Sequence, residues 1–275
     1  MHFFNKSNPI GIFDSGIGGL TVVKRVTSFL PNESIIYFGD TARVPYGSKS
    51  NSTVIEYSLQ DAEFLMKRNV KMIVVACNTA SSTALPALRE KFDLPVVGMI
   101  EPGAKMALQE TKNNRIGVIG TYATINNKAY SNELKKLSRK VKVFEKACPL
   151  FVPLAEEGWT HHKAAKLIAE EYLADLKKAD IDTLILGCTH YPLLADVIQK
   201  VLSAKVKLID SGTAASLVVE DYLNGRGIRN DSNLIGQHEF YVSDVPTKFR
   251  EVAERFLGGK VAHLKKIDLE ELIGK

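Results

Sequence analysis

Two cysteines, Cys77 and Cys188, are the residues of this sequence with the clearest capacity for chemistry. Each follows a short apolar segment that we expect to be a strand, and each precedes polar residues that open a predicted helix. The backbone N–H groups at a helix N-terminus favour a thiolate and lower the pKa of a thiol. A cysteine at a strand end is often only a small buried residue, which is our interpretation of Cys148. The matched settings of the other two favour a chemical role.

A glycine-rich turn from Asp14 to Gly19 is a second candidate site. Its backbone N–H groups could bind an anion, but the glycine spacing matches neither G-x-G-x-x-G nor the P-loop. A substrate carboxylate would suit the same donors, whereas Asp14 would repel a phosphate and could bind an ammonium group or orient a thiol. Gly18 and Gly19 could equally serve close packing. The segment 39–47, with its Pro, Tyr and Gly, predicts a long ordered turn of the kind that carries binding groups.

Histidines and glutamates supply the remaining candidates. His190 lies two residues after Cys188 and could be the acid/base partner of that thiol or form a structural hydrogen bond. Glu156 and Glu157 would ordinarily be solvated residues at a helix start. A zinc site needs three or four convergent ligands, and the usual spacings C-x-x-C and H-E-x-x-H do not occur. The neighbours His161 and His162 point to different faces of any helix, so we expect no metal.

A repeated pattern positions these residues: an apolar strand, a turn of small polar residues and an amphipathic helix occur five times. Continuous apolar strands that alternate with helices predict an α/β fold with doubly wound parallel sheets. Such sheets bind ligands at the carboxyl ends of their strands, where all five polar turns fall. The predicted strands are 9–13, 72–76, 115–119, 183–187 and 206–209.

The matched cysteine turns, together with the similar turns 14–16 and 210–212, indicate an internal duplication. We therefore expect two lobes with a pseudo-two-fold relation and the active site in the cleft between them. The first lobe is predicted to contain residues 1–98 and 209–275, and the second residues 99–208. Further along, 240–242 is predicted as one more strand and 246–257 as a surface helix.

Composition and charge exclude several classes of protein. The chain has 275 residues, of which 45% are hydrophobic and 24% charged, so disorder and fibrous structure are excluded. It has no apolar run long enough to span a bilayer, no signal-like N-terminus and no basic block behind its net charge of +5. We therefore expect neither a membrane nor nucleic acid as a partner. An odd number of cysteines makes no disulfide framework, which indicates a reduced, cytoplasmic protein.

Taken together, the motifs resemble those of bacterial glutamate racemases over residues 10–257. The matching segments, in the same order, are 14–20, 45–47, 76–80, 187–192 and 210–211. The resemblance implies a cofactor-independent isomerase that interconverts L- and D-glutamate and supplies D-glutamate for peptidoglycan. Aspartate racemase is the nearest alternative, and a non-catalytic amino-acid- or nucleotide-binding protein is a third. Two matched cysteines would have no purpose in the third. The oligomeric state is left open, a homodimer included.

The resemblance also implies roles for individual residues. Cys77 would act on D-glutamate with the help of Asp14. Cys188 would act on L-glutamate with the help of His190 and of a glutamate, either Glu156 or Glu157, of which we favour Glu156. The residues implied to hold the substrate are Asp14, Ser15, Tyr46, Gly47, Asn78, Thr79, Thr189 and His190, with Asp40 and Thr124 as weaker matches. Racemisation requires a proton to leave one face of Cα and another to arrive on the opposite face, which two thiols can do if one is ionised.

Overall fold

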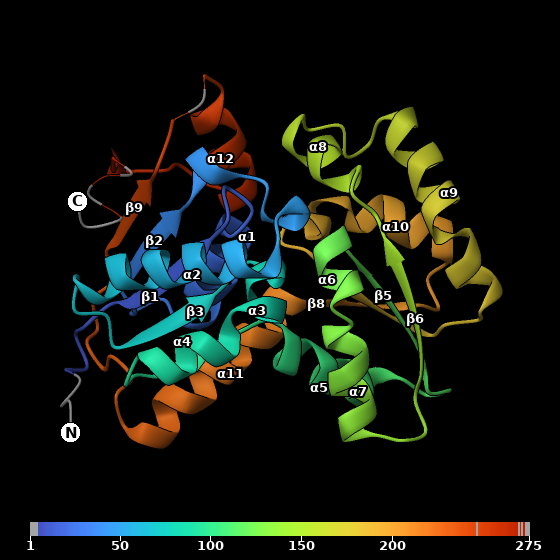
Figure 1. The fold of residues 1–275 in the computed structure, drawn as a ribbon, viewed down its shortest axis with the longest axis horizontal. Helices are drawn as coiled ribbons and strands as arrows, with labels where there is room; N and C mark the ends of the chain where they lie inside the picture. The colour runs from blue at the N-terminus through green and yellow to red at the C-terminus, as the bar shows by residue number, and fades with distance from the viewer. Residues whose placement is uncertain (1–4, 246, 269, 271, 273–275) are drawn as a thin grey trace.

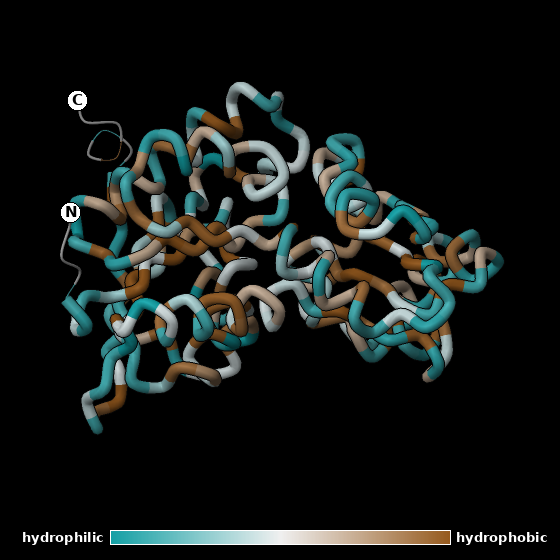
Figure 2. Tube along the Cα trace, turned by 90° about the horizontal axis from the view of Figure 1, so that it is seen from below, coloured by the Kyte–Doolittle hydropathy of each residue, from teal (hydrophilic) through white to brown (hydrophobic). Residues whose placement is uncertain are grey.

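The computed structural model describes residues 5–245, 247–268, 270 and 272. It contains two parallel β-sheets with helices packed on both faces of each (Figure 1), which confirms the predicted α/β class. Hydrophobic strands run through the middle of two bodies, and their outer segments are mostly hydrophilic (Figure 2). No helix among the described residues is long and apolar enough to cross a membrane.

The first sheet has the strand order β10-β9-β2-β1-β3-β4, and every neighbouring pair is parallel. Alternate residues of β1 face two different cores, because Ile10 and Ile12 pack with residues of α1 whereas Phe13 packs with residues of α2. The strands are β1 (Ile10–Asp14), β2 (Ile35–Gly39), β3 (Met72–Val75), β4 (Val96–Val97), β9 (His238–Val242) and β10 (Leu264–Lys266). The helices that follow or flank them are α1 (Leu20–Phe29), α2 (Asn51–Met66), α3 (Asn78–Thr83), α4 (Leu85–Lys91) and α12 (Phe249–Leu257).

The second sheet has the order β6-β5-β7-β8 and is also parallel throughout. Its strands are β5 (Arg115–Gly120), β6 (Lys142–Ala147), β7 (Thr183–Gly187) and β8 (Lys207–Asp210). The remaining helices are α5 (Ile100–Glu110), α6 (Tyr122–Asn126), α7 (Ala129–Leu137), α8 (Phe151–Glu156), α9 (Lys163–Lys178), α10 (Ala195–Leu202) and α11 (Ser211–Arg226). Short 3₁₀ turns are η1 (Thr41–Arg43), η2 (Tyr46–Ser48) and η3 (Tyr191–Leu194).

The two sheets repeat one strand order, which supports an internal duplication. If β1 is matched with β5, β2 with β6, β3 with β7 and β4 with β8, the orders β2-β1-β3-β4 and β6-β5-β7-β8 are the same. Cys77 and Cys188 follow β3 and β7, the equivalent strands of the two sheets. The similarity of Asp14 to Asp210 has no such basis, because Asp14 ends the first strand of one sheet and Asp210 the fourth strand of the other.

We keep the two-lobe division as a proposal, and sheet membership supports it. The strands of the first sheet lie within residues 10–97 and 238–266, and those of the second within 115–210. The second sheet extends past the predicted boundary at residue 209, because β8 pairs with β7 as far as Asp210. Helix α11 then packs against α1 and also against α5.

Several elements differ from the sequence-based prediction. The repeated pattern did not predict β2, because η1 and η2 rather than a helix follow it. It did not predict the edge strand β6, because the residues KVFEKA do not form a continuous apolar run. The break between α3 and α4 falls beside Pro86, which lies in the first turn of α4. Helix α12 starts at Phe249, and Pro246 of the predicted helix lies outside the described residues. This helix is not merely superficial, because it buries Phe249, Ala253 and Phe256.

A buried ion pair ties the start of β3 to the segments around it. Lys71 is fully buried, and its Nζ lies 2.6 Å from Oε2 of Glu33. The same ammonium group donates to the backbone oxygens of Lys6 and Ile228. Burial lowers the pKa of Lys71, and Glu33 opposes this effect. One ammonium group therefore joins three segments that are far apart in the sequence.

We expect Lys71→Met to lower the free energy of unfolding by about 3–5 kcal/mol, because it leaves the Glu33 carboxylate buried without its cation. Urea denaturation would measure the change. Lys6→Met is the matched control, since its exposed partner Asp231 stays solvated and its backbone oxygen is retained. Equal stabilities of the two variants would contradict this account.

Candidate active site

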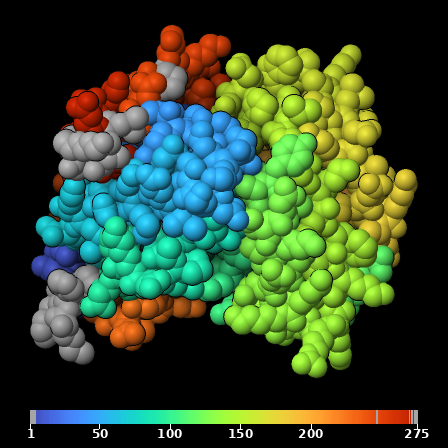
Figure 3. Space-filling model, in the orientation of Figure 1, coloured from blue at the N-terminus to red at the C-terminus, as the bar shows by residue number. Residues whose placement is uncertain are grey.

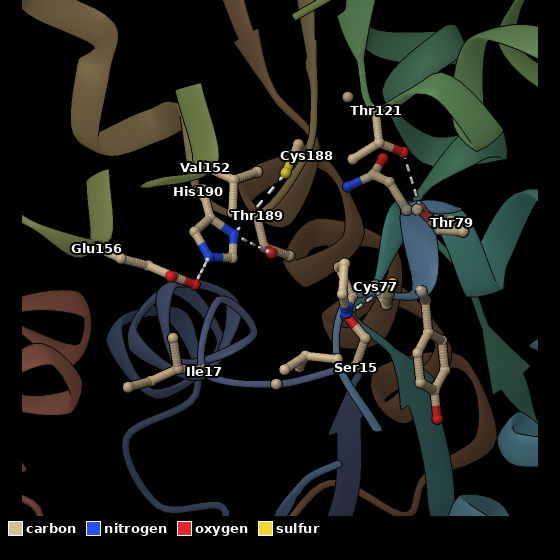
Figure 4. Close-up of a pocket in the computed structure, with 17 residues that line it drawn as sticks. Ser15, Ile17, Cys77, Thr79, Thr121, Val152, Glu156, Cys188, Thr189 and His190 are labelled. Carbon is tan, nitrogen blue, oxygen red and sulfur yellow. Dashed lines mark hydrogen bonds and ion pairs between the residues drawn. The ribbon is translucent and has the colours of Figure 1, made fainter. Parts of the chain in front are cut away.

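A cavity lies where the carboxyl ends of the two sheets face each other, and the space not filled by protein atoms, including the solvent at its open mouth, is about 550 Å³. Figure 4 shows Glu156, His190 and Cys188 on one side of it and Ser15 with Cys77 on the other. In Figure 3 the blue residues of the first lobe abut the green residues of the second along one face. The residues that line the cavity are Ser15, Gly16, Ile17, Val44, Pro45, Tyr46, Gly47, Cys77, Asn78, Thr79, Thr121, Val152, Glu156, Gly187, Cys188, Thr189 and His190.

Cys77 occupies the N-cap position of α3. Its Sγ accepts a hydrogen bond from the backbone N–H of Ala80 at 3.5 Å and donates to Oγ of Ser15 at 3.4 Å. Burial, aided by the negative charge of Asp14, raises the pKa of Cys77 to about 12. The expectation that the helix N-terminus would lower this pKa is therefore wrong, because desolvation outweighs the few donors of a six-residue helix. Cys77 is a neutral thiol at pH 7 in this structure.

Asp14 lies behind the cavity wall at the end of β1. Its Oδ2 accepts from the backbone N–H of Gly16 at 3.0 Å, whereas its buried Oδ1 has no hydrogen-bond partner among the described residues. Burial raises the pKa of Asp14, and His190 and the N–H groups of Gly19 and Gly16 oppose the increase. A carboxylate with one free oxygen beside a thiol can accept a proton or a hydrogen bond from a ligand.

Cys188 forms part of a chain of three polar side chains. Its Sγ lies 3.8 Å from Nδ1 of His190, and Nε2 of His190 lies 2.9 Å from Oε1 of Glu156. Burial lowers the pKa of His190, but the hydrogen bonds to Cys188 and Glu156 outweigh it and raise the pKa to about 10. His190 is therefore an imidazolium at pH 7. Glu157 points elsewhere, with Oε2 4.0 Å from Nζ of Lys248.

Hydroxyl and amide groups line the side of the cavity away from His190. The Oγ1 of Thr79 lies 3.0 Å from that of Thr121 and 3.3 Å from that of Thr124. Thr121 lines the cavity, whereas Thr124 is buried behind it. The sequence-based list contained Thr124 but not Thr121. The position of Thr121 as N-cap of α6, directly after β5, was the available signal.

Asn78 is held from two sides, because its Oδ1 accepts from the hydroxyl of Tyr130 at 2.7 Å and its Nδ2 donates to Oγ of Ser211 at 3.3 Å. Thr189 also lines the cavity, and its Oγ1 lies 3.4 Å from Nδ1 of His190. These contacts fix the positions of two polar side chains that face the cavity.

Tyr46 and Gly47 line the cavity, but the hydroxyl of Tyr46 does not face it. That hydroxyl lies 2.5 Å from Oδ2 of Asp40 and 2.9 Å from Oδ2 of Asp61, and Arg43 contacts both carboxylates. Asp40 is itself fully buried outside the cavity. This polar cluster holds the turn that carries Tyr46, so Asp40 supports the cavity wall rather than contacting a ligand.

Gly18 allows the two lobes to approach each other. A Cβ atom on Gly18 would overlap Oγ1 of Thr189 and would lie 2.6 Å from Cε1 of His190. The hydroxyl of Thr21 bonds to the carbonyl oxygen of Thr189 at 2.9 Å just beside this point. The glycine turn of the first lobe therefore packs directly on the turn that carries Cys188 and His190.

The comparisons with known proteins agree with this architecture. Residues 20–217 match the family model described as Asp/Glu/Hydantoin racemase. The glutamate racemase of Geobacter metallireducens is 52% identical over 95% of this chain and 97% of its own. The crystal structure of a glutamate racemase from Bacillus anthracis has a TM-score of 0.92 at 40% identity, covering 96% of this chain and 99% of its own. That from Francisella tularensis, in complex with D-glutamate, has a TM-score of 0.90 at 43% identity, covering 97% and 99%.

A fold of two parallel sheets with a cavity between them, together with these matches, shows the class of protein: the chain belongs to the Asp/Glu/Hydantoin racemase family, whose members are isomerases. Within that family, the relatives named above, which match this chain over nearly its full length, are glutamate racemases. The resemblance predicted from the sequence motifs is confirmed.

We expect Gly18→Ala to reduce racemase activity at least ~10-fold and to cost about 1–3 kcal/mol of stability, because the added methyl group must displace the turn of Thr189 and His190. Activity assays and thermal unfolding would measure both effects. Gly225→Ala is the control, since a Cβ at that helical glycine meets no atom within 4 Å. Full activity of the Gly18 variant would contradict this prediction, because it would show that the added methyl group does not displace the turn of Thr189 and His190.

We expect Glu156→Gln to lower the pKa of His190 from about 10 toward its ordinary value, because the variant removes one of the two partners that raise it. NMR titration of the imidazole would follow the change, with Glu157→Gln as the matched control. The raised pKa stabilises the folded protein fully below pH ~6.5, and that contribution is lost as the pH rises to about 10. The stability difference between wild type and Glu156→Gln should therefore shrink above neutral pH. An unchanged pKa in the variant would contradict this assignment.

Proposed function

We propose that this protein catalyses the cofactor-independent interconversion of L- and D-glutamate, with Cys77 and Cys188 as the two acid/base residues. The observation that carries the proposal is that two buried thiols, at equivalent strand ends of two different sheets, line one cavity. Racemisation needs a proton acceptor on one face of Cα and a proton donor on the other. Two lobes that each supply one thiol meet this requirement without rotation of the substrate.

The protonation states of the site suit attack on L-glutamate. Cys77 is a neutral thiol, and an imidazolium, His190, stands beside Cys188. A thiolate at Cys188 would be paired with this cation while it removes the α-proton of L-glutamate, and the thiol of Cys77 would deliver a proton to the opposite face. In the reverse direction Cys77 must be the ionised thiol, and Asp14 is the nearby carboxylate that can receive its proton.

The substrate's charges have fitting partners around the cavity. Carboxylate oxygens of glutamate would accept hydrogen bonds from Ser15, Asn78, Thr79, Thr121 and Thr189 and from the backbone N–H groups that follow the two cysteines. Donors to the α-carboxylate would also stabilise the negative charge that develops on it when the α-proton leaves. The carboxylate of Asp14, which lies just behind the cavity wall, would attract the ammonium group by its charge rather than by direct contact. Tyr46 and Gly47 would contribute main-chain contacts, because the Tyr46 hydroxyl is already engaged.

The proposal also covers the biological role of the protein and its cellular compartment. D-Glutamate supply for peptidoglycan follows from the family, and three free cysteines fit a reducing, cytoplasmic compartment. Assembly as a homodimer stays a prediction.

Incubation of L-glutamate in heavy water tests the two-thiol geometry. In a reaction stopped early, the D-product should carry deuterium at Cα, because Cys77 exchanges its proton with solvent before it delivers one. The remaining L-glutamate should stay almost entirely protiated. Chiral chromatography with mass spectrometry would measure both, and a parallel incubation with L-aspartate distinguishes an aspartate racemase. Substantial protium in the early D-product would refute the two-base scheme.

We expect Cys77→Ser and Cys188→Ser each to abolish racemisation, because a serine hydroxyl is far too weakly acidic to ionise near neutral pH. The Cys77 variant should still exchange the α-proton of L-glutamate slowly through Cys188. The Cys188 variant should exchange the α-proton of D-glutamate slowly through Cys77. Cys148→Ala is the control and should keep nearly normal turnover, since Cys148 does not line the cavity. Full racemisation by either serine variant would exclude that cysteine as an acid/base residue.

A further inference from the structure

Two neighbouring residues of α12, Arg255 and Phe256, contact the pair formed by Glu156 and His190. Arg255 Nη1 donates to the carbonyl oxygen of Glu156 at 2.7 Å. The ring of Phe256 meets the imidazole of His190 edge to face, with centroids 5.0 Å apart and planes at 80°. Helix α12 packs on α1 of the first lobe, whereas α8 lies beside the second sheet (Figure 1). The two contacts therefore reach across from one lobe to the other.

The Arg255 contact satisfies a group that α8 leaves without a partner. Glu156 is the last residue of α8, and carbonyl oxygens in the last turn of a helix have no donor within it. A guanidinium at this end bonds to the oxygen and also complements the helix dipole. Nη2 of Arg255 is held by Oε1 of Glu251 at 3.0 Å. Gly158 has a φ of +73°, and a Cβ there would lie 2.8 Å from Cζ of Arg255, so its lack of a side chain leaves space for the guanidinium.

The Phe256 ring is held just as firmly. Phe249, Ala253 and Phe256 form a buried stripe at helical spacing along α12. Phe256 is only 1% exposed, so its ring cannot move away from His190 without opening the core. The position of the ring against the imidazole is therefore fixed by the core of the first lobe.

We propose that Arg255 and Phe256 are positioning residues for the half-reaction of Cys188. Arg255 fixes the end of α8 so that the carboxylate of Glu156 reaches Nε2 of His190, and Phe256 fixes the plane of the imidazole so that Nδ1 faces Cys188. The expected effect on turnover rests on the racemase function proposed above. The effect on His190 itself requires no substrate.

Charge and position make opposite predictions for Arg255. The charged and titratable groups around His190 are Cys188, Asp14 and Glu156, with Arg255 beyond Glu156. Removal of a nearby cation, by its field alone, would raise the pKa of His190. Loss of the position of Glu156 would lower that pKa, because the imidazolium would lose its carboxylate partner for part of the time. The sign of the shift therefore separates the two roles.

The test is an NMR titration of His190 in Arg255→Gln, with the resonance assigned from its loss in His190→Asn. We expect the pKa to fall by about one unit or more. We also expect kcat/KM to fall ~10-fold or more in both directions, since enantiomers have an equilibrium constant of one and the two values must change together. The α-deuterium isotope effect should increase with L-glutamate and not with D-glutamate, because the step at Cys188 becomes slower.

Arg255→Lys keeps a cationic donor and should restore part of the activity and of the pKa. Arg250→Gln, an exposed change on the same helix, should behave as wild type. An unchanged or higher pKa of His190 in folded Arg255→Gln would overturn the proposal. A lowered pKa in a protein whose wild type racemises no glutamate would support the positioning role and refute the proposed function.

Discussion

The contact between the glycine turn of the first lobe and the Cys188–His190 turn of the second is the interaction on which the site depends. Parallel sheets present their ligand-binding groups at the carboxyl ends of strands, and here two separate sheets direct those ends at one another. The approach is close because Gly18 has no side chain to hold Thr189 and His190 away. A wider gap would admit water between the thiols and would weaken every electrostatic interaction in the cavity.

The neighbours of the two cysteines then give them different surroundings, although both are equally buried and occupy equivalent positions of a duplicated fold. Cys77 lies against serine and the carboxylate of Asp14, so desolvation keeps it a neutral thiol. Cys188 lies against an imidazolium that Glu156 supports. The surroundings of each thiol, rather than the local helix terminus, therefore produce the asymmetry on which the proposed two-thiol mechanism relies. The helix after Cys77 is too short to offset the loss of water.

Elements outside the duplication add to this asymmetry. The first sheet is extended by β9 and β10, and α12 lies between them in the chain. The second sheet has no such addition among the described residues. Arg255 and Phe256 belong to this added helix, and both contact groups on the side of Cys188. The duplicated parts thus provide the two thiols, whereas the added part contacts the surroundings of only one of them.

The sequence by itself determined the fold class and the matching positions of Cys77 and Cys188 at strand ends. It could do so because continuous apolar strands that end in polar turns are typical of the interior of parallel sheets, and because that pattern is local. It also determined the segments that carry Ser15, Asn78 and Thr189. It did not reveal β6, whose mixed polar and apolar residues are typical of an edge strand, nor the helix contacts of Arg255. Only the tertiary structure decided that Thr121 rather than Thr124 lines the cavity, that the Tyr46 hydroxyl faces Asp40, and that Glu156 rather than Glu157 contacts His190. Each of these depends on which way a side chain points and how much water its neighbours exclude, and residues distant in the chain set both.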